Sequence, residues 1–170
     1  MTDAARGLKV RLSAMFWLAQ MADGATLVLL SGHMSHLGFS GAQISYVYAS
    51  TALASLVSPL AFGWIADRFW PSQKLLGGCY LAAAPLLLIA WQQTEFAPLW
   101  MAMSGVALLR MPSRTLSNVI AFHHLGDTSR FGDVRVWGTL GWICVSWLLS
   151  LYLRFWEGQE PGVSHLGDAL

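Results

Sequence analysis

One long uncharged stretch constrains the fold of this chain more than any other feature. No Lys, Arg, Asp or Glu occurs between Asp23 and Asp67. Charged residues make up only 11% of the whole sequence, whereas soluble domains contain roughly 25%. We therefore expect an all-α membrane protein, in which apolar helices cross the bilayer.

Five apolar segments are candidates for these helices, because about 20 apolar residues are enough to span a bilayer. We expect spans at about residues 12–34, 42–66, 75–92, 98–123 and 136–153. The fourth segment is interrupted by Arg110, Pro112 and Arg114. The two arginines could line a cavity and favour an anionic substrate. Alternatively, they could end this span early at the cytoplasmic side, and this second alternative is the simpler one. We expect residues 1–155 to form the bundle and residues 156–170 a polar tail.

The distribution of Lys and Arg predicts the orientation of the chain. Most of these residues fall on the side of the N-terminus, namely Arg6, Lys9, Arg11, Arg68, Lys74, Arg130 and Arg135. The opposite side carries Arg154 after the fifth predicted span. The positive-inside rule therefore predicts a cytoplasmic N-terminus. We expect an integral, multi-pass protein of a bacterial inner membrane.

Several function classes are disfavoured by the sequence. A net charge of +1 gives no indication of a nucleic-acid partner. No nucleophile elbow, phosphate loop or catalytic carboxylate pair occurs, so we expect neither an enzyme nor a bound cofactor. Four histidines lie near the ends of predicted spans, at His33, His36, His123 and His124. Without further ligands, we expect them to lie at the membrane interface rather than to bind zinc. Lipid is the first expected partner.

The short loop between the second and third spans carries a compact charge pattern. Gly63, Asp67, Arg68 and Lys74 surround the end of one predicted helix and the start of the next. The acidic group could pair with basic groups on a neighbouring helix end and form a conformational latch that breaks and re-forms. A plain charged helix terminus is an equally good interpretation of these residues alone.

Arg135 begins the second notable pattern, at the mouth of the uncharged segment Val136–Leu153. An arginine at a membrane edge usually marks a cytoplasmic anchor or a substrate site. Thr139 and Trp142 follow Arg135 at helical spacing, so the three side chains share one face of a helix. They would offer a guanidinium group, a hydroxyl and an aromatic ring to a ligand.

Together, these motifs resemble a known family. The pattern from Gly63 to Arg68 resembles the cytoplasmic loop of the major facilitator superfamily. Three blocks resemble, more narrowly, its nucleoside:proton symporter family: LGFSGAQI at 37–44, IADRF at 65–69 and RVWGTLGW at 135–142. A weaker fourth block covers 111–122, and the similarity extends from about residue 8 to residue 150.

The resemblance implies a secondary transporter with a proton as its coupling ion. It implies that Arg135 lies in a nucleoside site, with Thr139 and Trp142 beside it, so the expected ligand is a nucleoside-like small molecule. The fold would be about five helices of the N-terminal half of a major facilitator superfamily transporter. Such transporters need about twelve spans in two halves that rock around a central site. We therefore expect a fragment whose missing C-terminal half is a further partner.

The first span departs from the family pattern. Family members carry tryptophans four and seven residues after a glutamine, whereas counting from Gln20 gives Gly24 and Leu27 here. Asp23 lies one residue before Gly24. A carboxyl group at this depth could carry protons or form an ion pair with an arginine of the fourth span, Arg110 or Arg114. Both alternatives stay open.

Two other functions are compatible with the sequence. The first is a transporter of the same fold for another solute, such as a sugar or an organic anion, which the changed first span motivates. The second is an accessory membrane protein that transports nothing.

Overall fold

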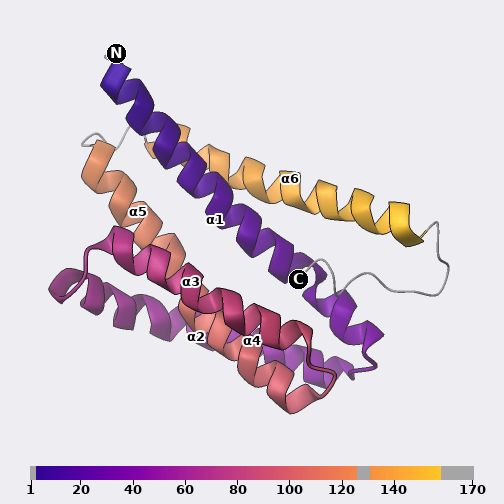
Figure 1. Cartoon of the computed structure of the whole chain (residues 1–170). Helices are drawn as coiled ribbons and strands as arrows, with labels where there is room; N and C mark the ends of the chain where they lie inside the picture. The colour runs from indigo at the N-terminus through magenta and orange to yellow at the C-terminus, as the bar shows by residue number, and fades with distance from the viewer. Residues whose placement is uncertain (1–2, 126–130, 158–170) are drawn as a thin grey trace. The chain divides into compact units, whose positions relative to one another are not determined.

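The computed structural model describes residues 3–125 and 131–157, and the regular secondary structure in this part of the chain consists only of helices joined by short turns. In chain order, they are α1 (Asp3–His36), α2 (Gly41–Arg68), α3 (Ser72–Trp91), α4 (Phe96–Arg110), α5 (Pro112–Leu125) and α6 (Phe131–Glu157). Figure 1 shows these six helices along the chain. The expected polar tail at 156–170 lies almost entirely outside the described residues.

Within the described residues, four stretches are long and apolar enough to cross a membrane. They are Arg6–His36, Gly41–Ala66, Ser72–Trp91 and Phe131–Phe155. The expected fourth span corresponds to two shorter helices, α4 and α5, which meet at Met111. Pro112 is the first residue of α5, a position where proline is well tolerated because no intrahelical N–H bond is lost there.

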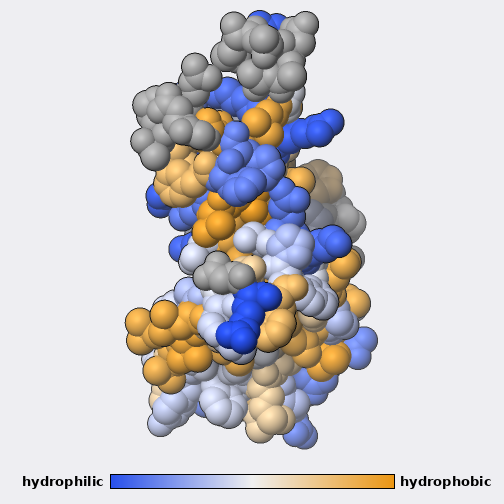
Figure 2. Space-filling model, turned by 90° about the vertical axis from the view of Figure 1, so that its left-hand side faces the viewer, coloured by the Kyte–Doolittle hydropathy of each residue, from blue (hydrophilic) through white to orange (hydrophobic). Residues whose placement is uncertain are grey.

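The outer surfaces of the helices are unusually apolar for a protein in water. Leu60 and Leu81 are each 78% exposed, and Trp147 is 72% exposed. Figure 2 shows patches of hydrophobic residues in orange on the face that it draws. Extended apolar surfaces of this kind mark contact with a membrane or with another protein. Lipid is the natural surrounding of these helices.

The chain forms two compact units, Ser31–Val119 and a second unit made of Met1–Leu30 and Ile120–Leu170. In the Ser31–Val119 unit, α4 packs against both α2 and α3. A Cβ atom at Gly105 of α4 would lie 3.0 Å from Leu86 Cδ1 of α3. Small residues let helices in lipid approach closely and gain van der Waals contact. A hydrogen bond from Ser104 Oγ to Ser50 Oγ, 3.1 Å long, joins α4 to α2.

The turn between α1 and α2 is specified locally. Gly38 has a φ of +81°, a left-handed conformation that glycine adopts without strain. Ser40 then caps α2, because its hydroxyl accepts a hydrogen bond from the backbone N–H of Gln43 at 3.3 Å. The Gln43 side chain in turn accepts one from the backbone N–H of Ser40 at 2.8 Å. This reciprocal capping box fixes the start of α2.

In the other unit, α1 and α6 lie side by side and run in the same direction (Figure 1). Lys9 pairs with Asp133 near the start of both helices, with 2.8 Å between Nζ and Oδ2. Further along, the rings of Trp17 and Trp137 lie 6.0 Å apart between centroids. This pair of helices carries the candidate site.

Candidate functional site in the α1 and α6 helix pair

One side of α6 is built to lie against another helix. Its buried residues are spaced four, three and four apart, at Val134, Gly138, Gly141 and Val145. This spacing places them on a single face. Because two of them are glycines, the backbones of α6 and α1 can come much closer than larger side chains would allow.

The closest approach is at Gly141. A Cβ atom built there would lie 2.5 Å from the carbonyl oxygen of Trp17. A second close approach involves Gly24 of α1, where a Cβ atom would lie 2.8 Å from Val145 Cγ1 and 3.4 Å from Trp142 Cδ2. The two helices are therefore fitted to glycine at both positions.

The second contact gives a physical reason for a small residue at position 24. Trp142 of α6 packs directly over Gly24. A large side chain at position 24 would collide with Val145 and with the Trp142 ring. At this level the aromatic surface comes from Trp142 of α6.

Arg135, Thr139 and Trp142 lie next to the packed face of α6. Arg135 and Thr139 are exposed, and Trp142 is half-buried. The structure thus brings the three predicted side chains to one flank of the helix. Their role as ligands of a substrate stays a prediction.

An aromatic cluster lies beneath the guanidinium group of Arg135. Its Cζ atom lies 5.8 Å from the ring centroid of Phe131, one turn earlier in α6. The Phe131 ring stacks on Phe122 of α5 with a centroid distance of 4.4 Å and meets the edge of Phe16 of α1 at 6.1 Å. The cation–π contact and the packed rings below it orient the arginine side chain. Sequence analysis did not predict this cluster.

The three charged residues of the predicted proton or ion-pair site differ in burial. Asp23 in α1 is 3% exposed and Arg110, the last residue of α4, is 5% exposed. Arg114, one turn later in α5, is exposed. Buried charges need partners or a functional reason to be there, so Asp23 and Arg110 stay candidates for function. Whether Asp23 pairs with either arginine stays a prediction.

The predicted latch lies at the end of α2. Arg68 is its last residue and its Cζ atom lies 6.0 Å from the ring centroid of Phe69, while Lys74 is exposed in the first turn of α3. A Cβ atom at Gly63 would meet nothing within 4 Å. The Asp67 side chain lies outside the described part of the structure, so the latch stays a prediction.

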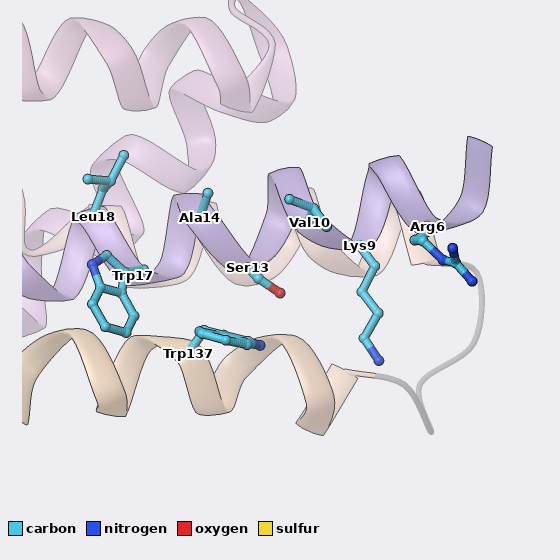
Figure 3. A pocket seen from close by; sticks show the side chains of 8 residues that line it. All are labelled: Arg6, Lys9, Val10, Ser13, Ala14, Trp17, Leu18 and Trp137. Carbon is cyan, nitrogen blue, oxygen red and sulfur yellow. The ribbon is translucent and has the colours of Figure 1, made fainter. Parts of the chain in front are cut away.

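Sequence analysis also missed a groove on α1. It has a volume of about 570 Å³ and is lined by residues of α1 and by Trp137 of α6 (Figure 3). The lining residues are Arg6, Lys9, Val10, Ser13, Ala14, Trp17, Leu18 and Trp137. The mixture of basic and aromatic residues near the start of the first span was the available signal for this groove.

The histidines do not form a metal site within the described residues. No group of three or more His, Cys, Asp and Glu side chains there could hold a metal ion. His33 is buried and His36 is exposed at the end of α1. His124 of α5 bonds through Nδ1 to the carbonyl oxygen of Ile120 at 2.8 Å.

Comparison with known proteins assigns the chain to a family. The family model described as nucleoside H+ symporter matches residues 6–161. YegT of Escherichia coli (strain K12) is 40% identical over 134 residues, which cover 78% of this chain and 32% of YegT. The xanthosine permease of the same strain is 31% identical over 150 residues, covering 85% of this chain and 36% of the permease.

A solved structure agrees with these relatives. The crystal structure of the nucleoside transporter NupG superposes with a TM-score of 0.81 at 29% identity, covering 85% of this chain and 37% of NupG. The predicted all-α fold and the predicted family are both confirmed. The chain spans about a third of the length of the relatives it matches. It is an integral, multi-pass membrane protein, and it belongs to the nucleoside H+ symporter family.

Proposed function

We propose that this chain supplies the N-terminal part of a proton-coupled nucleoside transporter, with Arg135, Thr139 and Trp142 in the substrate site. The remaining part of such a transporter is its expected protein partner. The proposal includes a bacterial inner membrane as the location and a cytoplasmic N-terminus. The proton serves as coupling ion, and no cofactor is required.

The observation that carries the proposal is the flank of α6 within a chain that matches the family over residues 6–161. A nucleoside is uncharged, and its ribose hydroxyls and base edges need hydrogen-bond partners as well as an apolar surface for the base. The exposed guanidinium group of Arg135 and hydroxyl of Thr139 can provide the hydrogen-bond partners. The Trp142 ring can provide the apolar surface for the base.

Uptake by a chimaera tests this proposal. Residues 6–155 of this chain replace the matching segment of NupG, and the chimaera is expressed in bacteria that lack nucleoside transporters. We expect uptake of radiolabelled uridine that excess unlabelled uridine or adenosine abolishes and that sugars or organic anions leave unchanged. Competition by sugars instead would favour a transporter of another solute. A chimaera that reaches the membrane and transports nothing would favour an accessory protein.

The role of Asp23 is tested in the same chimaera with Asp23→Asn. If the carboxyl group carries protons, the variant loses accumulation of uridine against a gradient but keeps exchange of labelled for unlabelled uridine. If Asp23 instead forms an ion pair with Arg110 or Arg114, the variant loses thermal stability, and adding Arg110→Gln or Arg114→Gln, whichever removes the partner, restores part of it. The two alternatives therefore predict different results for exchange and for stability.

A further inference from the structure

We propose that the groove on α1 binds one anionic phospholipid, with its phosphate at Arg6 and Lys9 and an acyl chain along Trp17 and Trp137. No such role follows from the transport function proposed above. The lipid would lie at the end of the helix pair that carries the N-terminus.

The shape of the groove fits an amphiphile better than a nucleoside. Its volume of about 570 Å³ falls within the range typical of ligand sites, roughly 300–1,000 Å³. Beyond the first two turns of α1, the walls of the groove are almost entirely apolar and are formed by Val10, Ala14, Leu18 and the two tryptophans. The buried Ser13 hydroxyl and the indole N–H groups are the polar groups there. A nucleoside would leave most of its hydrogen-bonding groups unpaired in this groove.

The basic residues at one end of the groove favour a ligand with a negative charge. Arg6 and Lys9 both line it, and both are cationic at neutral pH. Lys9 already pairs with Asp133 at 2.8 Å, so part of its charge is compensated. Arg6 is exposed and makes no hydrogen bond or ion pair among the described residues. The guanidinium group of Arg6 therefore provides most of the attraction for a phosphate.

The position of the groove along α1 fits the headgroup region of a bilayer. Arg6 precedes the apolar body of the span, and Trp17 follows about three turns later. Basic residues and tryptophans commonly mark this boundary, and basic pockets between helices there bind anionic lipid headgroups. Val10 and Leu18, 63% and 65% exposed, line the side along which an acyl chain would lie.

Native mass spectrometry of the full chain in detergent tests the proposal. The probes are phosphatidylglycerol and phosphatidylcholine with identical acyl chains. We expect retention of one phosphatidylglycerol molecule and little phosphatidylcholine. Arg6→Gln should weaken phosphatidylglycerol retention about five-fold, the effect of roughly one basic residue near a membrane surface. Arg11→Gln removes the same charge outside the groove and should leave retention unchanged.

A variant that should strengthen phosphatidylglycerol retention separates effects on lipid binding from effects on the structure. Asp133→Asn removes the carboxylate that competes for Lys9 and should strengthen phosphatidylglycerol retention. A merely structural contribution of the Lys9–Asp133 pair would weaken it instead. Equal retention of the two lipids, or equal weakening by Arg6→Gln and Arg11→Gln, would overturn the proposal.

Tryptophan fluorescence gives a second readout that does not depend on a charge change. Phosphatidylglycerol with brominated acyl chains should quench the chain more strongly than brominated phosphatidylcholine. This excess quenching should disappear when Trp17→Phe and Trp137→Phe are combined, and it should persist in Trp147→Phe, since Trp147 is 72% exposed and outside the groove. Excess quenching that persists in the double variant would place the lipid elsewhere and refute the assignment.

Discussion

A methyl group at position 141 would collide with the backbone of α1. In Gly141→Ala, the new Cβ atom would lie 2.5 Å from the Trp17 carbonyl oxygen and 3.1 Å from the Trp17 Cα atom. Real Cβ contacts are essentially never under 3.0 Å, so α6 has to move away from α1 by at least about 0.5 Å. A gap of 0.5–1 Å already forfeits roughly a quarter to a half of the attraction between packed atoms.

The expected cost follows from comparison with a matched glycine. Overpacking of this kind costs about 1–3 kcal/mol, whereas Gly→Ala in a helix otherwise gains about 1 kcal/mol through intrinsic propensity. Gly77→Ala in α3 carries the same gain without the collision, because a Cβ atom at Gly77 meets nothing within 4 Å. Gly141→Ala should therefore be less stable than Gly77→Ala by about 1–3 kcal/mol.

The assay is reversible unfolding in mixed micelles, in which SDS is titrated into the detergent-solubilised chain and helix content is followed by circular dichroism. The midpoint of Gly141→Ala should shift to a lower SDS fraction than that of Gly77→Ala. If the two variants unfold at the same SDS fraction, α1 and α6 do not approach each other at Gly141, and the placement of the candidate site loses its basis.

Two further predictions concern polar contacts within each unit. Lys9→Gln should lower the free energy of unfolding by less than about 1 kcal/mol, because Lys9 and Asp133 are 38% and 59% exposed. The effect should vanish in high salt. A larger loss of stability that persists in high salt would contradict this prediction. Ser104→Ala removes the hydrogen bond to Ser50 and should cost about 0.6 kcal/mol in the same assay, whereas Ser55→Ala, an exposed control on α2, should cost less. Equal costs for these two variants would show that the interhelical bond adds nothing.

The helices could be predicted from the sequence better than their ends. The apolar segment expected at 12–34 lies within α1, which begins nine residues earlier, at Asp3, in the structure. Arg6, Lys9 and Arg11 lower the local hydropathy without opposing a helix, so an apolar segment underestimates the length of the helix. The interruption expected around Pro112 corresponds to the boundary between α4 and α5.

Helix faces were harder to predict. In lipid, the outward side of a helix is as apolar as the packed side, so hydrophobic periodicity indicates the packed face only weakly. The spacing of Gly138 and Gly141 was the available signal, since small residues mark close approach. The cluster of Phe16, Phe122 and Phe131 depends on residues far apart in the sequence, and no local pattern indicates such contacts.

Among the predicted site residues, Arg135, Thr139 and Trp142 could be grouped because they lie on one helix, where spacing alone determines the face. The relation of Asp23 to Arg110 could not be predicted in the same way, because it depends on the positions of separate helices. The packing of Trp142 over Gly24 also needed the structure, since it follows from the close approach of two helices.

The most direct test of the proposed function is uridine uptake by the NupG chimaera carrying Arg135→Ala, with Arg154→Ala as the matched control. Both arginines are exposed on α6, but Arg154 lies in its last turn, away from the candidate site. Loss of a hydrogen bond to a charged donor costs about 1.5–3 kcal/mol, so Arg135→Ala should raise the KM for uridine about ten- to hundred-fold. Arg154→Ala should leave it unchanged. Equal KM values for the two variants at equal membrane levels would contradict the assignment of Arg135 to the nucleoside site.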